Sequence, residues 1–226
     1  LTDREFGEFM TFVEGRIDGI LALKKICESV NFRAGNNEAE LHELFKRCPW
    51  LIDPSFTQFL ISDQWLETMF ARLAKYLEIG DYAPEGSKND DRADLVFLLG
   101  NRGLERLVIV ELKATNTCLV VDHLNQLESY MRRARDWLSE HHKSDCRVHG
   151  ILIGSKAPPE SKAEGVQALR DRIERHGGPR SDFEVLDVLE VLERTLAAHR
   201  ELQEIYDRLA ATEDQEEEVM EEVAAS

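Results

Sequence analysis

The chain has 226 residues, a formal net charge of −16, 42% hydrophobic and 32% charged residues. Such a composition is typical of a folded globular protein, and the length suffices for one main domain with accessory elements. No apolar run approaches a membrane-spanning length and no signal peptide leads the sequence, so we expect no membrane association. The strong negative charge argues against coating nucleic acid by bulk electrostatics, although it leaves local binding open.

Cysteine usage indicates a reducing compartment. The four cysteines lie far apart in the sequence and form no CxxC pair, which predicts neither a disulfide framework nor a zinc site. We therefore expect a cytoplasmic protein.

The order of patterns divides the chain into four segments. They are a helical N-terminal segment at 1–30, a main domain at 31–188, a C-terminal helix at 189–211 and an acidic tail at 212–226. The tail carries seven acids from Glu213 onward and no base, so we expect it to be disordered. The leucine-rich helix before it could pack on the core or against another subunit.

Apolar periodicity predicts the elements in chain order. The first helix, at 2–30, contains three glycines, which favour two short helices or one bent helix. Further helices are expected at 38–47, 62–77, 123–142 and 161–176, and further strands at 148–153 and 183–187. Together with the hairpin described next, these elements predict an α/β fold.

A β-hairpin is predicted around the turn at 100–103, whose sequence is Gly-Asn-Arg-Gly. If Leu99 pairs with Arg106, the antiparallel register places Asp94 directly opposite Glu111. Lys113 then points to the same side of the sheet, two residues further along the strand. Three ionisable groups should therefore meet at one end of this hairpin.

Two carboxylates facing each other across a ladder repel, so something must neutralise them. Hard oxygen ligands at this spacing suit Mg²⁺, which makes a metal site our first interpretation. The alternative is a solvated acid at Asp94 and a frayed strand end at Glu111. The four apolar residues before Glu111 favour burial on both faces and hence the metal site.

Two helices could add to this site. Asn37 is expected to cap the helix at 38–47, and Glu40 is either the reciprocal member of a capping box or a catalytic acid. Asp122 is expected to cap the helix at 123–142. On that helix, four side chains at steps of four, three and four share one face: Gln126, Tyr130, Arg133 and Trp137.

The ordered set resembles the PD-(D/E)xK nuclease superfamily. Asp94 is followed after sixteen residues by Glu111-x-Lys113, preceded by a helical Glu40 and followed by Gln126-x-x-x-Tyr130. Ala93 stands where the superfamily has proline. Within the superfamily, the acid-rich helix running into Pro49-Trp50 and the Val-Glu-Leu-Lys strand are most similar to the nuclease domain of Shedu anti-phage proteins, over about residues 37–155.

This resemblance implies a restriction-endonuclease-like core, with a mixed central sheet of about four strands flanked by helices and with helical N- and C-terminal additions. It implies a metal-dependent DNA endonuclease or nickase, the effector of an anti-phage defence system, that acts on double-stranded DNA as a homo-oligomer. The implied cofactor is Mg²⁺, for which Mn²⁺ could substitute. The metal ligands would be Asp94, Glu111, the carbonyl of Leu112, and Glu40 directly or through water.

The same resemblance implies roles for the other residues. Lys113 would orient or deprotonate the attacking water, and Gln126 would position that water or a neighbouring phosphate together with Tyr130. DNA would be contacted by Arg132, Arg133 and Arg135, whose alternative is a set of solvated helix charges. A competing hypothesis is a catalytically weak, nuclease-like module that binds DNA ends or assembles into oligomers under the control of an upstream domain.

Overall fold

The structure is a computed structural model. It describes residues 2–29, 32–33, 35–56, 61–80, 92–100, 105–177, 181–201 and 204, and for Asp3, Phe6 and 61–65 it describes the backbone alone. Residues 101–103 of the predicted turn, most of the C-terminal helix beyond residue 201 and the acidic tail lie outside the described residues. Among the described helices, none combines the length and the apolar character that crossing a membrane requires.

A mixed sheet of five strands forms the centre of the fold, in the order β1-β2-β3-β4-β5. The pairs β1–β2 and β2–β3 are antiparallel, whereas β3–β4 and β4–β5 are parallel. The mixed α/β architecture is thus confirmed, with one strand more than the expected four or so. The strands are β1 (Ile61–Trp65), β2 (Arg92–Leu99), β3 (Arg106–Leu112), β4 (Arg147–Gly154) and β5 (Phe183–Asp187).

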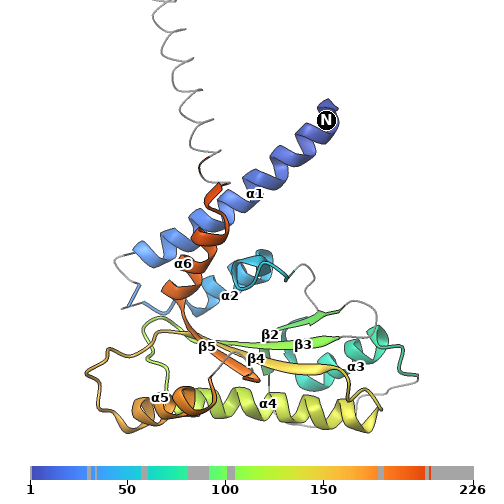
Figure 1. Ribbon diagram of the computed structural model, residues 1–226, viewed down its shortest axis with the longest axis vertical. Helices are drawn as coiled ribbons and strands as arrows, with labels where there is room; N and C mark the ends of the chain where they lie inside the picture. The colour runs from blue at the N-terminus through green and yellow to red at the C-terminus, as the bar shows by residue number, and fades with distance from the viewer. Residues whose placement is uncertain are drawn as a thin grey trace, which may run out of the picture.

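Helices cover both faces of the sheet (Figure 1). One face carries α1 (Asp3–Glu28), α2 (Glu38–Arg47), the 3₁₀ turn η1 (Pro49–Leu51) and α6 (Val188–Ala198). The opposite face carries α3 (Leu66–Tyr76), α4 (Val121–Glu140) and α5 (Glu164–His176). The result is a three-layer sandwich in which each face of the sheet has its own apolar cluster.

Strand β3 is buried on both faces, which explains its unbroken apolar run. Leu107 and Ile109 pack into the cluster beneath α3 and α4, while Val108 and Val110 pack beneath α1, α2 and α6. Side chains alternate along a strand, so Glu111 follows Ile109 onto the α4 side. The Glu111 carboxylate is therefore placed near the end of a buried strand.

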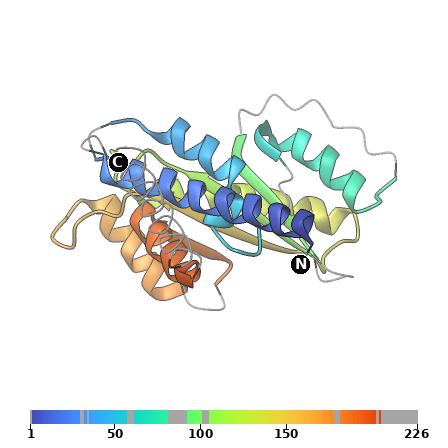
Figure 2. The same ribbon diagram turned by 90° about the horizontal axis from the view of Figure 1, so that it is seen from above.

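Helix α1 is continuous over 26 residues, so the alternative of two short helices is wrong. Thr2 and Glu5 form a capping box at its start. Gly19 does not interrupt the helix but permits contact, because a Cβ there would lie 2.7 Å from the ring of Trp50. Seen from above, α1 runs between α2 and α6, both of which it contacts (Figure 2).

The starts of α3 and α4 differ from the predictions. Residues 62–65, expected to begin a helix, belong to β1, because pairing with β2 outweighs a weak helical pattern. Helix α4 begins at Val121 after an N-cap at Val120, so Asp122 lies in the first turn and does not cap it. There its carboxylate still complements the positive end of the helix dipole.

Candidate active site

The site forms where β2 and β3 separate. Their predicted register is confirmed from Leu99↔Arg106 to Leu95↔Val110, where the ladder ends, while β2 continues its pairing with β1. The next β3 donor facing β2, the Leu112 N–H, is taken by Asp94 Oδ2 at 2.7 Å. The Asp94 carboxylate thus replaces a backbone carbonyl where the strands diverge.

Glu111 and Lys113 lie on one side of the strand end, as predicted. Lys113 Nζ donates to Glu111 Oε1 at 2.6 Å, and the Glu111 side chain is only 2% exposed. Its second oxygen, Oε2, is buried and has no hydrogen-bond partner among the described residues. Burying an oxygen without a hydrogen-bond partner costs free energy, and such oxygens are typical of sites that bind an ion or a ligand.

Two side chains of helix α2 form hydrogen bonds to the backbone at the ends of β2 and β3, on the face of the sheet opposite α4. Glu38 Oε2 accepts the Ala114 N–H at 3.0 Å. His42 Nε2 donates to the Asp94 carbonyl at 3.0 Å, because a carbonyl oxygen can only accept. A cavity of about 310 Å³ opens here, lined by Asn36, Glu38, Ala39, His42, Asp94 and Leu112.

The residue before α2 contributes to the same fastening. Asn37 Oδ1 accepts from the Thr115 N–H at 3.1 Å and from the Thr115 hydroxyl at 2.8 Å. The Ser155 hydroxyl donates to the Thr115 carbonyl at 2.6 Å. Side chains at the start of α2 and just after β4 therefore fix the backbone that follows β3, next to Lys113.

Electrostatics at the site favour an added cation. Burial, together with the negative charge of Asp94, raises the pKa of Glu111 to about 7, against the lowering effect of Lys113. Burial also raises the pKa of Asp94, although the Leu112 N–H and Lys113 oppose this. Burial alone would lower the pKa of Lys113, but its bond to Glu111 and the surrounding carboxylates raise it.

The structure does not bring Glu40 to the site. Its side chain is exposed, and the expected capping box is absent, since Asn37 makes no side-chain cap and bonds to Thr115 instead. Glu38 lies about 200° around the helix from Glu40 and faces the strand ends. The family resemblance pointed to Glu40, and only the packing of the helix shows that Glu38 faces the strand ends; a role for Glu40 stays a prediction.

The glutamine helix reaches the site only at its start. Gln126 Nε2 donates to the Tyr130 hydroxyl at 2.7 Å, and Tyr130 is buried. His123, one turn earlier, was missed. Its Nδ1 accepts the Val120 N–H at 3.3 Å, and burial, together with the positive charge of Lys113, lowers its pKa. Its spacing of three residues from Gln126 was the available signal.

The three arginines of α4 do not converge on the site. Arg133 pairs with Glu67 of α3 at 3.4 Å, and Arg135 pairs with Asp182 at 3.1 Å. Arg132 is exposed and lies about 13 Å along the helix from His123. Two of the three therefore have structural partners, and their role in binding DNA stays a prediction.

The residues present fit Mg²⁺, which binds through one or two carboxylates and keeps several waters. Within the described part of the chain, no three His, Cys, Asp or Glu side chains form a closed metal cage. A hydrated Mg²⁺ ion needs only one or two protein carboxylates, and Asp94 and Glu111 supply two. One of their oxygens, Glu111 Oε2, has no hydrogen-bond partner among the described residues. Leu112 lines the same cavity as Asp94.

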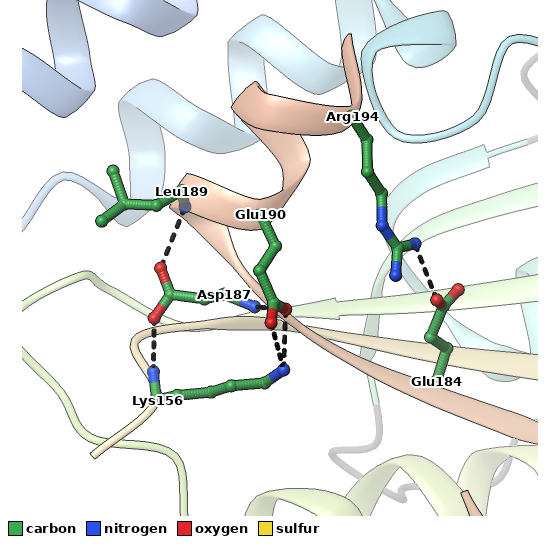
Figure 3. Close-up of polar contacts among 6 residues, drawn as sticks. All are labelled: Lys156, Glu184, Asp187, Leu189, Glu190 and Arg194. Atoms are coloured by element: carbon green, nitrogen blue, oxygen red, sulfur yellow. Dashed lines mark hydrogen bonds and ion pairs between the residues drawn. The ribbon is translucent and has the colours of Figure 1, made fainter. Parts of the chain in front are cut away.

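A second lysine–glutamate pair lies at the ends of β4 and β5 (Figure 3). Lys156 Nζ donates to both oxygens of Glu190, at 2.8 and 2.7 Å. Asp187 accepts the N–H groups of Lys156 and Leu189 and donates its own N–H to Glu190. Every carboxylate oxygen of this network has a partner, and the network caps α6.

Comparisons with known proteins add no assignment: no protein-family model matches the chain, and no curated protein matches its sequence. Functional inference therefore depends on the geometry above.

Proposed function

We propose that the chain is a metal-dependent DNA endonuclease or nickase that hydrolyses phosphodiester bonds. The observation that supports this most is a buried glutamate, Glu111, which lies beside Asp94 and is hydrogen-bonded to Lys113, and one of whose oxygens has no partner among the described residues. Two acids and an amine at diverging strand ends suit metal-assisted attack on a phosphate. The fold that this proposal implies is a restriction-endonuclease-like core.

In this proposal Asp94, Glu111 and the Leu112 carbonyl hold Mg²⁺, with Mn²⁺ able to substitute. Glu38 takes the place expected for Glu40, directly or through water, since its charge acts on both acids. When bound, the ion supplies charge stabilisation at the phosphate and acidifies a water.

The remaining steps belong to the protein. Lys113 orients the attacking water and offsets the negative charge that develops on the phosphate. His42 holds the Asp94 backbone in place. Gln126, which donates to the Tyr130 hydroxyl, would position the attacking water or a neighbouring phosphate together with Tyr130. Together these contacts keep the reacting groups in a fixed geometry before substrate arrives.

The resemblance to Shedu nuclease domains supports a role in anti-phage defence with double-stranded DNA as substrate and a homo-oligomer as the working form. The alternative is a nuclease-like module that binds DNA ends or assembles without cleaving. Its supporting observation is that Arg133 and Arg135 are engaged in ion pairs, which leaves the glutamine helix with little free positive charge beside the site.

A cleavage assay tests the proposal. The protein is incubated with linear and circular duplex DNA in parallel with Mg²⁺, Mn²⁺ and EDTA. We expect cleavage or nicking with either metal and none with EDTA. Retention of DNA in a gel without cleavage under any divalent metal would favour the binding module instead.

A further inference from the structure

A groove of about 740 Å³ lies on the far side of α2 from the acidic site. It is bounded by α1, the C-terminal end of α2 and η1. Its lining combines aromatic rings and arginines: Thr11, Phe12, Gly15, Arg16, Asp18, Gly19, Arg47, Cys48 and Trp50. Among the described residues, none of the contacts given above for Asp94, Glu111 or Lys113 involves these lining residues.

One wall of the groove is built and fixed. The guanidinium of Arg16 lies 4.2 Å from the centre of the Trp50 ring. His199 donates from Nδ1 to the Thr195 carbonyl at 3.0 Å, so its Nε2 is left to accept from Arg16 Nη1 at 3.4 Å. The Trp50 and His199 rings are 5.2 Å apart. Arg16 is therefore held in place before any ligand arrives.

Two glycines of α1 shape the floor. Gly19 lets the Trp50 ring approach the helix closely, since a side chain there would collide with it. Above Gly15 nothing lies within 4 Å of the position a Cβ would take, so the floor stays open.

The groove lining also includes exposed aromatic and basic side chains. The Phe12 ring is 54% exposed, although it lies 5.0 Å from the Arg16 guanidinium. Arg47 is exposed at the end of α2. The lining thus holds two guanidinium groups against one carboxylate, Asp18, in a chain whose net charge is −16. An anion with a flat, stackable ring complements this set.

We propose that this groove binds an unpaired nucleotide of a DNA strand, with the base stacked on Phe12 and the phosphate contacted by Arg47 and Arg16. Base stacking on an aromatic ring beside basic side chains is the usual chemistry of single-strand recognition. The choice of nucleic acid rests on the proposed function. Glu38 and Arg47 lie at opposite ends of α2, about 13 Å apart, so one strand can reach both sites.

Binding is measured in EDTA, so that no cleavage occurs, with a fluorescently labelled oligothymidylate and with tryptophan fluorescence as a second readout. Phe12→Ala should weaken binding roughly five- to hundredfold through lost stacking. Arg47→Ala should weaken it and make the affinity less dependent on salt. Trp50 fluorescence should be quenched when the wild-type protein binds.

Matched controls exist on the same elements. Phe9 is 46% exposed on α1 but does not line the groove, and Lys46 neighbours Arg47 on α2. Phe9→Ala and Lys46→Ala should bind as the wild type does. All four side chains are substantially exposed, so the variants should fold, which circular dichroism checks.

The outcomes separate the two proposals. Oligonucleotide binding that depends on Phe12 supports the groove even if Mg²⁺ elicits no cleavage, in which case only the nuclease function fails. Binding that is absent, or equal in Phe12→Ala and Phe9→Ala, overturns the groove. A dimer that light scattering shows to require Phe12 would likewise overturn it, by assigning the groove to a second copy of the chain.

Discussion

In two lysine–glutamate pairs at the ends of sheet strands, the pKa of the glutamate is shifted in opposite directions. Both oxygens of Glu190 accept hydrogen bonds from Lys156, and one also accepts the Asp187 N–H. Burial raises the pKa of Glu190, but these bonds lower it by more, so the pKa lies below its usual value. Glu111 gives one oxygen to Lys113, keeps the other unpartnered among the described residues, and has a raised pKa. Both Glu190 oxygens are thus paired within the fold, whereas one Glu111 oxygen has no partner in the part of the chain that the structure describes.

The difference arises from burial and from neighbours. Glu190 lies near the surface and caps a helix, so solvent and backbone N–H groups satisfy it. Glu111 is buried beside a second acid, Asp94, where solvent does not reach its charge to stabilise it. Proteins keep such destabilising arrangements chiefly at functional sites.

The largest expected effect separates the two lysines. Lys113→Ala should reduce Mg²⁺-dependent DNA cleavage by about 10²-fold or more, because the positive charge beside the water and the phosphate is lost. Lys156→Ala removes an equivalent charge from the other pair and should leave the rate within a few fold. Initial rates on supercoiled plasmid measure both, and equal rates for the two variants would contradict the assignment.

The two glutamates should respond oppositely to pH in the metal-free protein. The pKa of Glu111 is raised from 4.5 to about 7 by folding. Its stabilising effect is thus complete below pH 4.5 and lost as the pH rises through 7. Glu111→Gln should therefore raise the free energy of unfolding at pH 8 by roughly 1–3 kcal/mol, with the gain vanishing below pH 4.5.

Glu190 provides the matched control. Its pKa is lowered in the folded state, so its stabilising effect is present above the unfolded value and is lost as the pH falls through the folded one. Glu190→Gln should lower stability at pH 8, by less than about 1 kcal/mol because the pair is partly exposed. Urea denaturation in EDTA across pH 4 to 8 measures both; parallel slopes would count against the comparison.

A smaller effect distinguishes the two acids of α2. Glu38→Gln should lower the cleavage rate about tenfold, in the range seen when groups supporting a metal site are lost, and raise the Mg²⁺ concentration required. Glu40→Gln, on the exposed side of the same helix, should match the wild type. Rates over a Mg²⁺ titration decide this, and a loss confined to Glu40→Gln would restore the sequence-based choice.

Local patterns predicted much of the fold. The hairpin register followed from a turn signal and from the period of two along a strand, and the bounds of α2 and β5 followed from capping and turn residues. Strand β1 could not be predicted in this way. Its sequence has no strong period of its own, and its conformation depends on pairing with β2.

The site was predicted in part for a related reason. Asp94, Glu111 and Lys113 lie on one hairpin, where local geometry determines what faces what. Glu38 and His42 come from a helix far earlier in the chain, and only tertiary packing shows which face of that helix meets the strand ends. Sequence periodicity predicts that a helix has two faces but does not assign a partner to each.

Calorimetric titration of Mg²⁺ at pH 7.5 tests most directly whether the Glu111 carboxylate binds a cation. We predict that the wild type and Glu190→Gln bind Mg²⁺ alike, whereas Glu111→Gln shows no binding. Absence of binding to the wild type, or undiminished binding to Glu111→Gln, would contradict the account.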